Sequence, residues 1–176
     1  KTADVPIAFC LSGGVDSTTL AGMAAKYFGQ DLHAFSVIDR DERYNESDNI
    51  NKMVEFLGCE HFVTHVNPDG FVERVRGLIS DHDAPVPTIS YYVHSFLSEQ
   101  IKSRGFSVVM SGTGADELFT GYYDHYSYWL AQLAKSRDIE SLVSDWQGSY
   151  GSWVNNPLLQ DPLAFKKEPG KRDHLF

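Results

Sequence analysis

The residues best suited to chemistry lie in a short stretch rich in serine and glycine, Ser12-Gly13-Gly14-Val15-Asp16-Ser17. It follows an apolar, β-rich run at residues 5–11 and precedes residues 18–28, where apolar side chains recur at helical spacing. Two glycines let the backbone approach an anion closely, while serine hydroxyls and the free amides of a helix N-terminus donate hydrogen bonds to it. The stretch therefore predicts a site for a phosphate or pyrophosphate.

Asp16 adds a condition to that prediction. A carboxylate within a phosphate site repels the ligand unless a cation lies between them, so we interpret Asp16 as a magnesium ligand beside a pyrophosphate. The stretch lacks the Gly-Lys-Ser/Thr of kinase and GTPase loops, and it does not match the dinucleotide fingerprint. The alternative is an ordinary glycine-rich turn in which Asp16 and Ser17 cap the next helix. Its place between a strand and a helix favours the phosphate site.

A second stretch of similar character, Ser111-Gly112-Thr113-Gly114-Ala115-Asp116-Glu117, follows an apolar strand pattern at residues 107–110. Because parallel strands end at the same edge of a sheet, we expect this stretch to emerge beside the first one. Asp116, at the start of a helix, would then supply a second carboxylate to the metal. Taken alone, Asp116 and Glu117 are also ordinary residues for a helix N-terminus.

The elements that must position these stretches alternate along the chain. The pattern predicts strands at residues 5–11, 32–38, 61–66 and 107–110, and helices at 18–28, 49–57, 71–79 and 91–102. Strands separated by helices lie parallel, so the predicted class is α/β, with a doubly wound, mostly parallel sheet and helices on both faces. His61 and His65 alternate with apolar residues, and we expect both to face solvent.

The pattern changes beyond Gly121. Residues 122–135 and 139–146 read as helices rich in aromatic residues, and from Gly148 the chain reads as a loop. We therefore predict one domain at residues 1–147 and a loop-rich, partly disordered tail at 148–176. Because the first residue is Lys1 and a strand pattern begins almost at once, we expect the chain to be a fragment of a longer one.

Composition narrows the function classes. With 15 basic and 24 acidic side chains, the net charge of -9 argues against a nucleic-acid partner. The longest uncharged apolar stretch, residues 5–15, is too short to cross a membrane, so we expect no membrane partner. Cys10 and Cys59 lie far apart in apolar segments, which indicates neither a disulfide scaffold nor a zinc site and favours a cytoplasmic location.

The two stretches together carry a family resemblance. The first resembles the pyrophosphate-binding loop of the N-type ATP pyrophosphatases, also called the PP-loop superfamily, which split ATP between its α- and β-phosphates. The second, with Leu118-Phe119-Thr120-Gly121-Tyr122 after it, is similar to the second signature of the asparagine synthetase synthase domain. The resemblance runs from about residue 5 to residue 128. It implies an adenine nucleotide alpha hydrolase-like fold with ATP lying across both turns.

The resemblance also implies roles for single residues. ATP and its pyrophosphate would bind at the residues that match the two nucleotide-lining segments, Leu11, Ser12, Gly13, Gly14, Asp16, Ser17, Val37, Ser111 and Gly112. Mg²⁺ would bind to Asp16 and Asp116, which with Thr113 would be the catalytic residues. The substrate would bind at Gly114, Glu117 and Tyr122.

The implied reaction forms an amide on a carboxylate substrate through an acyl-adenylate, and it releases AMP and pyrophosphate. Ammonia would come from a glutaminase domain that this chain lacks, because Cys10 lies inside a strand and cannot be its N-terminal cysteine. A homodimer is possible. At the third position of the second motif asparagine synthetases carry glutamate, whereas this chain has Thr113. Either another group replaces that carboxylate, or the acceptor is not aspartate.

Two alternatives remain at this stage. The chain is either a different PP-loop pyrophosphatase, of the tRNA-modifying or NAD- or GMP-synthetase kind, or an ATP-binding module without catalysis. The acidic balance argues against a tRNA substrate. Thr113, together with the lack of a lysine that matches the family's lysine near the α-phosphate, is the best support for a non-catalytic module.

Overall fold

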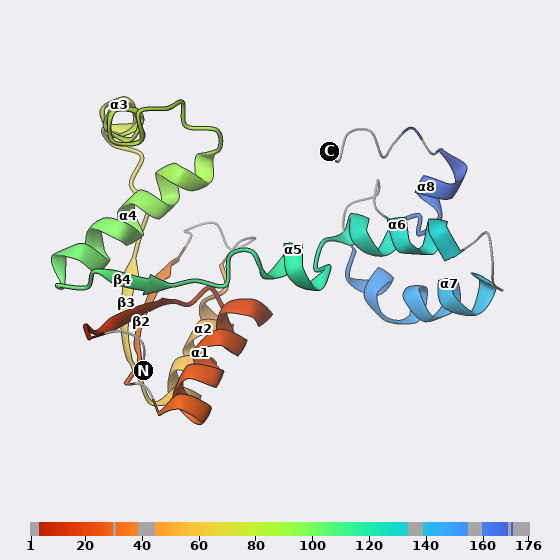
Figure 1. The fold of residues 1–176 in the computed structure, drawn as a ribbon, viewed down its shortest axis with the longest axis horizontal. Coiled ribbons are helices and arrows are strands. Elements are labelled where there is room, and N and C mark those ends of the chain that lie inside the picture. The colour runs from red at the N-terminus through yellow and green to blue at the C-terminus, as the bar shows by residue number, and fades with distance from the viewer. Residues whose placement is uncertain are drawn as a thin grey trace. The chain divides into compact units, whose positions relative to one another are not determined.

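The computed structural model describes residues 4–29, 31–38, 45–133, 139–154, 160–168 and 170. The chain forms two compact units, Lys1–Thr113 and Gly114–Phe176 (Figure 1). Each unit is described by itself.

The first unit is a four-stranded parallel sheet with the strand order β3-β2-β1-β4. Its strands are β1 (Ile7–Cys10), β2 (His33–Val37), β3 (Glu60–Thr64) and β4 (Val108–Met110). The helices of this unit are α1 (Val15–Phe28), α2 (Ser47–Leu57), α3 (Phe71–His82) and α4 (Ile89–Ser103). This arrangement confirms the doubly wound α/β fold that the alternation of strand and helix patterns predicts.

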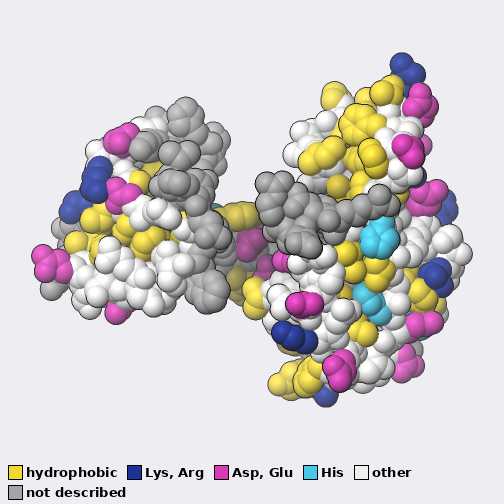
Figure 2. Space-filling model, turned by 180° about the vertical axis from the view of Figure 1, so that it is seen from behind, with side chains coloured by type: hydrophobic (Ala, Val, Ile, Leu, Met, Phe, Trp, Pro, Cys, Tyr) yellow, Lys and Arg dark blue, Asp and Glu magenta, His cyan; other side chains and the backbone are white. Residues whose placement is uncertain are grey.

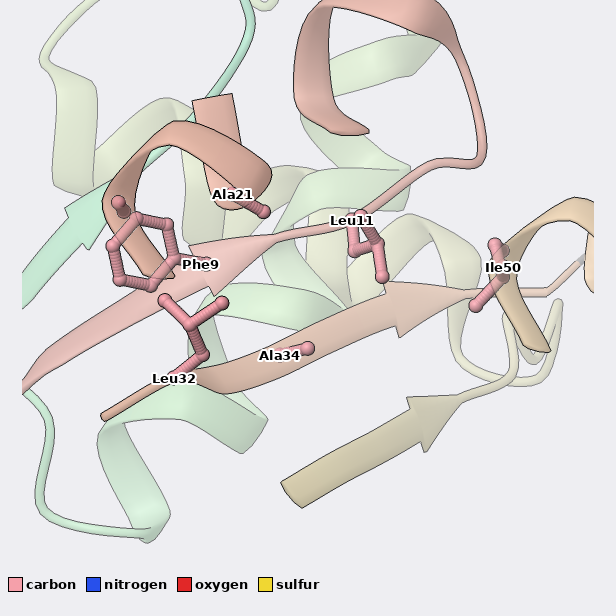
Figure 3. Close-up of a cluster of buried hydrophobic side chains, with 7 residues drawn as sticks. Phe9, Leu11, Ala21, Leu32, Ala34 and Ile50 are labelled. Carbon is pink, nitrogen blue, oxygen red and sulfur yellow. The ribbon is translucent and has the colours of Figure 1, made fainter. Parts of the chain in front are cut away.

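The core of this unit has two layers because β1 and β2 are buried on both faces. On one face, Phe9 and Leu11 pack with Ala21 of α1 and Ile50 of α2 (Figure 3). On the other face, Phe35 packs in a second cluster with side chains of α4. Helices therefore cover both faces of the sheet, as predicted (Figure 1).

Two helix ends are set by glycine, as the sequence predicts. Gly29, which follows α1, has φ +57°, and its amide donates to the carbonyls of Ala24 and Ala25. Gly58 ends α2 in the same left-handed conformation. Glycine adopts this conformation without the steric cost of a Cβ, so each helix stops where the next strand must begin.

The second unit contains α5 (Ala115–Phe119), α6 (Tyr123–Leu133), α7 (Ile139–Gly148), the 3₁₀ turn η2 (Tyr150–Trp153) and α8 (Ala164–Lys167). Its buried cluster joins Leu130, Trp146 and Val154. The compact units divide after Thr113, whereas the division into a domain at residues 1–147 and a tail at 148–176 stays a prediction. Val154 and Phe165, in the predicted tail, are buried. The end of the predicted helix 122–135 and parts of the tail lie outside the described residues.

The surface and the helices add two observations. On the face shown in Figure 2, the described lysine and arginine side chains are scattered among acidic ones. Among the helices of the described ranges, none combines the length and apolar character that crossing a bilayer requires.

Candidate functional site

The strand order places the two motifs side by side. β1 and β4 are neighbours and run parallel, with Phe9 paired to Met110, so both strands end at the same edge of the sheet. From β1 the chain crosses to β2 on one side, and it returns at β4 on the other, which makes this edge the topological switch point of the sheet. The loop after β1 and the segment after β4 therefore leave the sheet together, as predicted.

The first loop is held in shape by its own serines. The main-chain nitrogen of Ser12 donates to Ser17 Oγ at 3.1 Å, and the two hydroxyls lie 2.9 Å apart. Ser17, only 7% exposed, also approaches the carbonyl of Gly14 at 3.2 Å. Both hydroxyls are hydrogen-bonded within the loop, and their binding of a phosphate stays a prediction. They fix the turn that carries the main-chain amides of α1's first residues.

Two glycines at this edge are required by close packing. Gly112 lies so near the first turn of α1 that a Cβ there would be 2.8 Å from Ser17 N and 3.1 Å from Asp16 C. Gly13 has φ +77°, and a Cβ there would be 3.2 Å from Cβ of Asn49 and 3.3 Å from the carbonyl of Glu46. At Gly112 a Cβ would force main-chain atoms to move, and at Gly13 the positive φ together with the close contacts disfavours any other residue. The sequence indicated glycine for approach to an anion, and the structure adds its contact with neighbouring segments.

Leu11 and Val37 lie at the ends of β1 and β2. The Leu11 side chain is only 1% exposed and belongs to the core cluster of Figure 3, whereas Val37 is partly buried against the second cluster. Their predicted contact with adenosine remains a prediction. The main chain of Leu11 is anchored to β2 through its amide, which donates to the carbonyl of Phe35 at 2.9 Å.

Thr113 lies where the second motif leaves the first unit. Its hydroxyl is 2.8 Å from Ser111 Oγ, and its amide approaches the same atom at 3.3 Å. Thr113 also lines a cavity of about 1150 Å³ whose other walls are formed by polar and charged side chains of α3, α4 and the turn before α3. His94 and Lys102 are among the residues that line it. Sequence reasoning did not single out these two residues.

The second unit holds the rest of the second motif. A Cβ added to Gly121 would overlap the carboxylate oxygen Oδ1 of Asp116, and the amide of Gly121 donates to the carbonyl of Asp116 at 3.0 Å. The Asp116 side chain therefore lies across the backbone at Gly121. Gly114, with φ +93°, precedes α5 and begins the turn.

Glu117 and Tyr122 form a local pair on the surface of the second unit. The Tyr122 hydroxyl donates to Glu117 Oε1 at 2.6 Å. This hydrogen bond is the main cause that lowers the pKa of Glu117, and the same bond raises the pKa of Tyr122 above its usual value. The pair stays ionised on the carboxylate and protonated on the phenol at neutral pH. Two residues that the sequence predicts for substrate binding therefore contact each other.

The predicted metal ligands lie in different units. Asp16 belongs to the first unit and Asp116 to the second, so their sharing of one ion remains a prediction. Within the described ranges, no group of three or more His, Cys, Asp or Glu side chains forms a metal-binding cluster. Magnesium usually takes one or two carboxylates and completes its shell with phosphate oxygens and water.

Two polar residues beneath the site were misjudged or missed. His61, expected to face solvent, is partly buried, and its Nε2 lies 2.9 Å from the hydroxyl of Ser36. Ser36 is only 1% exposed and was not singled out, because a lone serine in an apolar strand carries no motif. The alternation of polar and apolar residues cannot tell a solvent-facing histidine from one that bonds a buried hydroxyl.

The fold is that of a doubly wound α/β protein whose two glycine-rich motifs meet at the switch point of the sheet. The family model described as asparagine synthase matches residues 1–168. The chain belongs to the asparagine synthase family, whose members use ATP.

Individual relatives agree with this assignment. The chain is similar to asparagine synthetase (glutamine-hydrolyzing) 1 of Bacillus subtilis, at 31% identity over 68% of this chain and 19% of the relative. It is 35% identical to asparagine synthetase (glutamine-hydrolyzing) 1 of Arabidopsis thaliana, over 68% of this chain and 22% of that protein. It is 29% identical to amidase chyE of Penicillium rubens, over 68% of this chain and 20% of the amidase. The match spans about a fifth of the length of these curated relatives.

Among solved structures, the chain is similar to a crystal structure of a predicted subunit of tRNA methyltransferase from Methanocaldococcus jannaschii. The TM-score is 0.39 and the sequence identity 25%, over 62% of this chain and 53% of that one.

Proposed function

We propose that this chain is the synthase part of an ATP-dependent ligase that forms an amide on a carboxylate substrate, releasing AMP and pyrophosphate. Membership of the asparagine synthase family supports the use of ATP. The observation that carries the proposal is the contact of the two glycine-rich motifs at the ends of β1 and β4, where Gly112 packs on the first turn of α1. We propose that a nucleotide binds at this edge, where both motifs would line it.

The proposed binding of ATP follows from the chemistry of that edge. The main-chain amides at the start of α1 carry no intrahelical partner, and the helix dipole favours an anion there. We propose that they receive the β- and γ-phosphates at residues 12–17, and that Ser111 and Gly112 line the nucleotide on its other side. The adenosine would lie over the ends of β1 and β2, at Leu11 and Val37.

The donor set fits magnesium. Asp16 and Asp116 offer carboxylate oxygens, the ligand type that this hard cation prefers, and neither has an ion-pair partner among the described residues. When bound, the ion would neutralise charge on the departing pyrophosphate. We propose these two residues as its protein ligands.

The proposed reaction has two steps. An oxygen of the substrate carboxylate attacks the α-phosphorus, and the bond from that phosphorus to the bridging oxygen breaks, so that pyrophosphate leaves. Ammonia then attacks the acyl carbon, AMP leaves with the former carboxylate oxygen, and the nitrogen loses a proton. The chain contributes position and hydrogen-bond donors where charge accumulates, so no covalent bond to the protein is needed.

For the acceptor, we propose the cavity between α3 and α4 that reaches Thr113. Lys102 is the wall cation proposed to meet a carboxylate, although four acidic side chains, Asp69, Glu73, Asp81 and Glu99, also line the cavity; Thr113 offers a hydroxyl in place of the family's glutamate. Gly114, Glu117 and Tyr122 stay proposed substrate-binding residues on the second unit. Either another group replaces the missing carboxylate at Thr113, or the acceptor is a carboxylate other than aspartate.

We propose that ammonia comes from a glutaminase domain, because relatives such as the Bacillus subtilis synthetase are named as glutamine-hydrolyzing. A reducing cytoplasm is the proposed setting, since both cysteines are free thiols.

An isotope experiment tests the proposal. Each member of a panel of carboxylates, labelled with ¹⁸O in the carboxyl group, is incubated with the protein, ATP, Mg²⁺ and ammonium or glutamine. An acyl-adenylate route requires pyrophosphate release that depends on the carboxylate and one ¹⁸O atom in AMP. Formation of ADP and phosphate, or AMP without the label, contradicts it. ATP binding without pyrophosphate release under any carboxylate favours the non-catalytic module.

A further inference from the structure

Two consecutive hydrogen bonds connect His61, Ser36 and Leu11 beside the first loop. Ser36, the next-to-last residue of β2, is only 1% exposed, and its hydroxyl donates to the carbonyl of Leu11 at 2.5 Å. Leu11 is the last residue before the loop of residues 12–17, and its amide is already bonded to the carbonyl of Phe35. Ser36 therefore completes the anchoring of the residue from which the loop departs.

The direction of the next hydrogen bond follows from counting protons. A serine hydroxyl has one proton, and that of Ser36 is given to Leu11. His61 Nε2, 2.9 Å from Ser36 Oγ, must therefore be the donor, which assigns a proton to Nε2. Burial lowers the pKa of His61, so the ring is the neutral tautomer with its proton on that nitrogen. His61 therefore donates to Ser36, and Ser36 donates to the carbonyl of Leu11.

These two hydrogen bonds connect β3 to the residue that follows β1, although the two strands are not neighbours. β3, which carries His61, is separated from β1 by β2, and Ser36 of β2 bridges the gap. The imidazole orients the serine hydroxyl, because a hydroxyl that receives a hydrogen bond has fewer directions left for its own proton. The orientation of the Leu11 carbonyl then fixes where the loop begins.

We propose that His61 is a positioning residue for the first loop, acting through Ser36 on the Leu11 carbonyl, and thereby for the nucleotide that the loop receives. The part that concerns the nucleotide rests on the proposed function. The part that concerns the loop stands on the two hydrogen bonds alone.

A matched pair of variants separates positioning from packing. In His61→Gln the amide nitrogen reaches the place of Nε2 and keeps the donor, whereas in His61→Asn the shorter side chain reaches only the place of Nδ1. Hydrogen exchange of the Leu11, Ser12 and Thr18 amides, which are hydrogen-bonded around the loop, is measured in both variants without any ligand, together with calorimetric affinity for ATP with Mg²⁺. Leu97→Val, which loosens the opposite face of the sheet, controls for a general loss of stability.

We expect His61→Asn to speed exchange of these three hydrogen-bonded amides by about three- to tenfold and to weaken ATP binding by a similar factor, the worth of one hydrogen bond. His61→Gln should restore both values. Equal exchange in Asn and wild type, or equal acceleration in Asn and Gln, overturns the proposal. If His61→Asn does not fold, Ser36→Ala replaces it and must give the same acceleration.

The outcomes also separate this inference from the proposed function. One outcome is faster exchange in His61→Asn but not in His61→Gln, while the wild-type protein does not bind ATP. That result supports the role of His61 in positioning the loop and contradicts the proposed binding of ATP. The opposite outcome is ATP binding by the wild-type protein with the same exchange rates in His61→Asn and His61→Gln. That result supports the binding of ATP and contradicts the positioning role of His61.

Discussion

A methyl group on Gly112 would lie 2.8 Å from the main-chain nitrogen of Ser17. The end of β4 thus presses against the first turn of α1, although the two residues are distant in the sequence. Main-chain atoms at such a distance cannot turn aside as a side chain can. The contact is the most direct physical link between the two motifs.

Gly112→Ala should separate these segments. We expect a loss of about 1–3 kcal/mol of stability from overpacking, and ATP affinity at least about tenfold lower. Chemical denaturation and calorimetry measure the two effects. Gly148→Ala is the matched control, because a Cβ there meets nothing within 4 Å. An alanine variant with unchanged ATP affinity would show that the motifs need not touch for binding.

Asp16→Asn tests the proposed metal ligand with almost no change in shape. The amide keeps one oxygen but loses the charge, so we expect the Mg²⁺-dependent part of ATP affinity to fall by at least about tenfold. Titrating Mg²⁺ at fixed ATP measures it. Asp48→Asn, at the exposed start of α2, removes the same charge elsewhere and should leave the titration unaltered. Equal titrations for Asp16→Asn and wild type would refute the assignment.

Gly121→Ala addresses Asp116 without removing its carboxylate. The new Cβ would overlap the Asp116 side chain, which can rotate away, so the expected cost in stability is below about 1 kcal/mol. The Mg²⁺ titration should nevertheless shift in the direction of Asp116→Asn, because the carboxylate is displaced. If Asp116→Asn shifts the titration and Gly121→Ala does not, the orientation of that side chain at Gly121 is irrelevant to the metal.

Tyr122→Phe should raise the pKa of Glu117 toward its ordinary value, since the tyrosine hydroxyl is the largest cause of its depression. The carboxyl-carbon chemical shift of Glu117 as a function of pH reports the change. Tyr91→Phe, in the first unit, serves as the control and should leave that curve in place. A Glu117 curve that does not move with Tyr122→Phe means that the hydrogen bond does not form in solution.

Acid should destabilise the fold partly through His61. Its pKa in the folded state is lowered, so the unfolded chain binds the proton first as pH falls. The stabilisation is present above the ordinary histidine value of about 6.5 and is lost progressively below it. His61→Gln cannot titrate and should lose less stability than wild type between about pH 7 and pH 5, measured by urea unfolding. Parallel losses in both proteins would exclude this contribution.

The fold was predictable where local pattern decides it. Apolar strand runs, helical spacing and the helix stops at Gly29 and Gly58 are local signals, and they led to the doubly wound sheet. The position of both motifs at one edge followed from the parallel order. The burial of Val154 and Phe165 was not predicted, because single apolar residues among loop-forming ones carry no periodic signal.

The interior of the site was not predictable in the same way. The fit of Gly112 on Ser17 depends on two segments that meet only after folding, so no local pattern reports it. His61 was expected to face solvent, since polar–apolar alternation assumes that polar residues seek water. Here the imidazole finds a hydroxyl inside the sheet, and only the register of β2 with β3 brings them together.

Because β1 and β4 are neighbours in the sheet, the segment between them begins and ends at adjacent points. Helices α3 and α4 lie within that segment and pack on each other, while β1 and β4 hold its two ends in the sheet. Exchanging the residues of α3 and α4 that line the proposed acceptor cavity would alter its walls and leave the loop after β1 unchanged, provided that Leu97 and Ile101 of α4, which pack on the sheet, are kept. The proposed preference for an acceptor can therefore change at positions apart from the proposed nucleotide site.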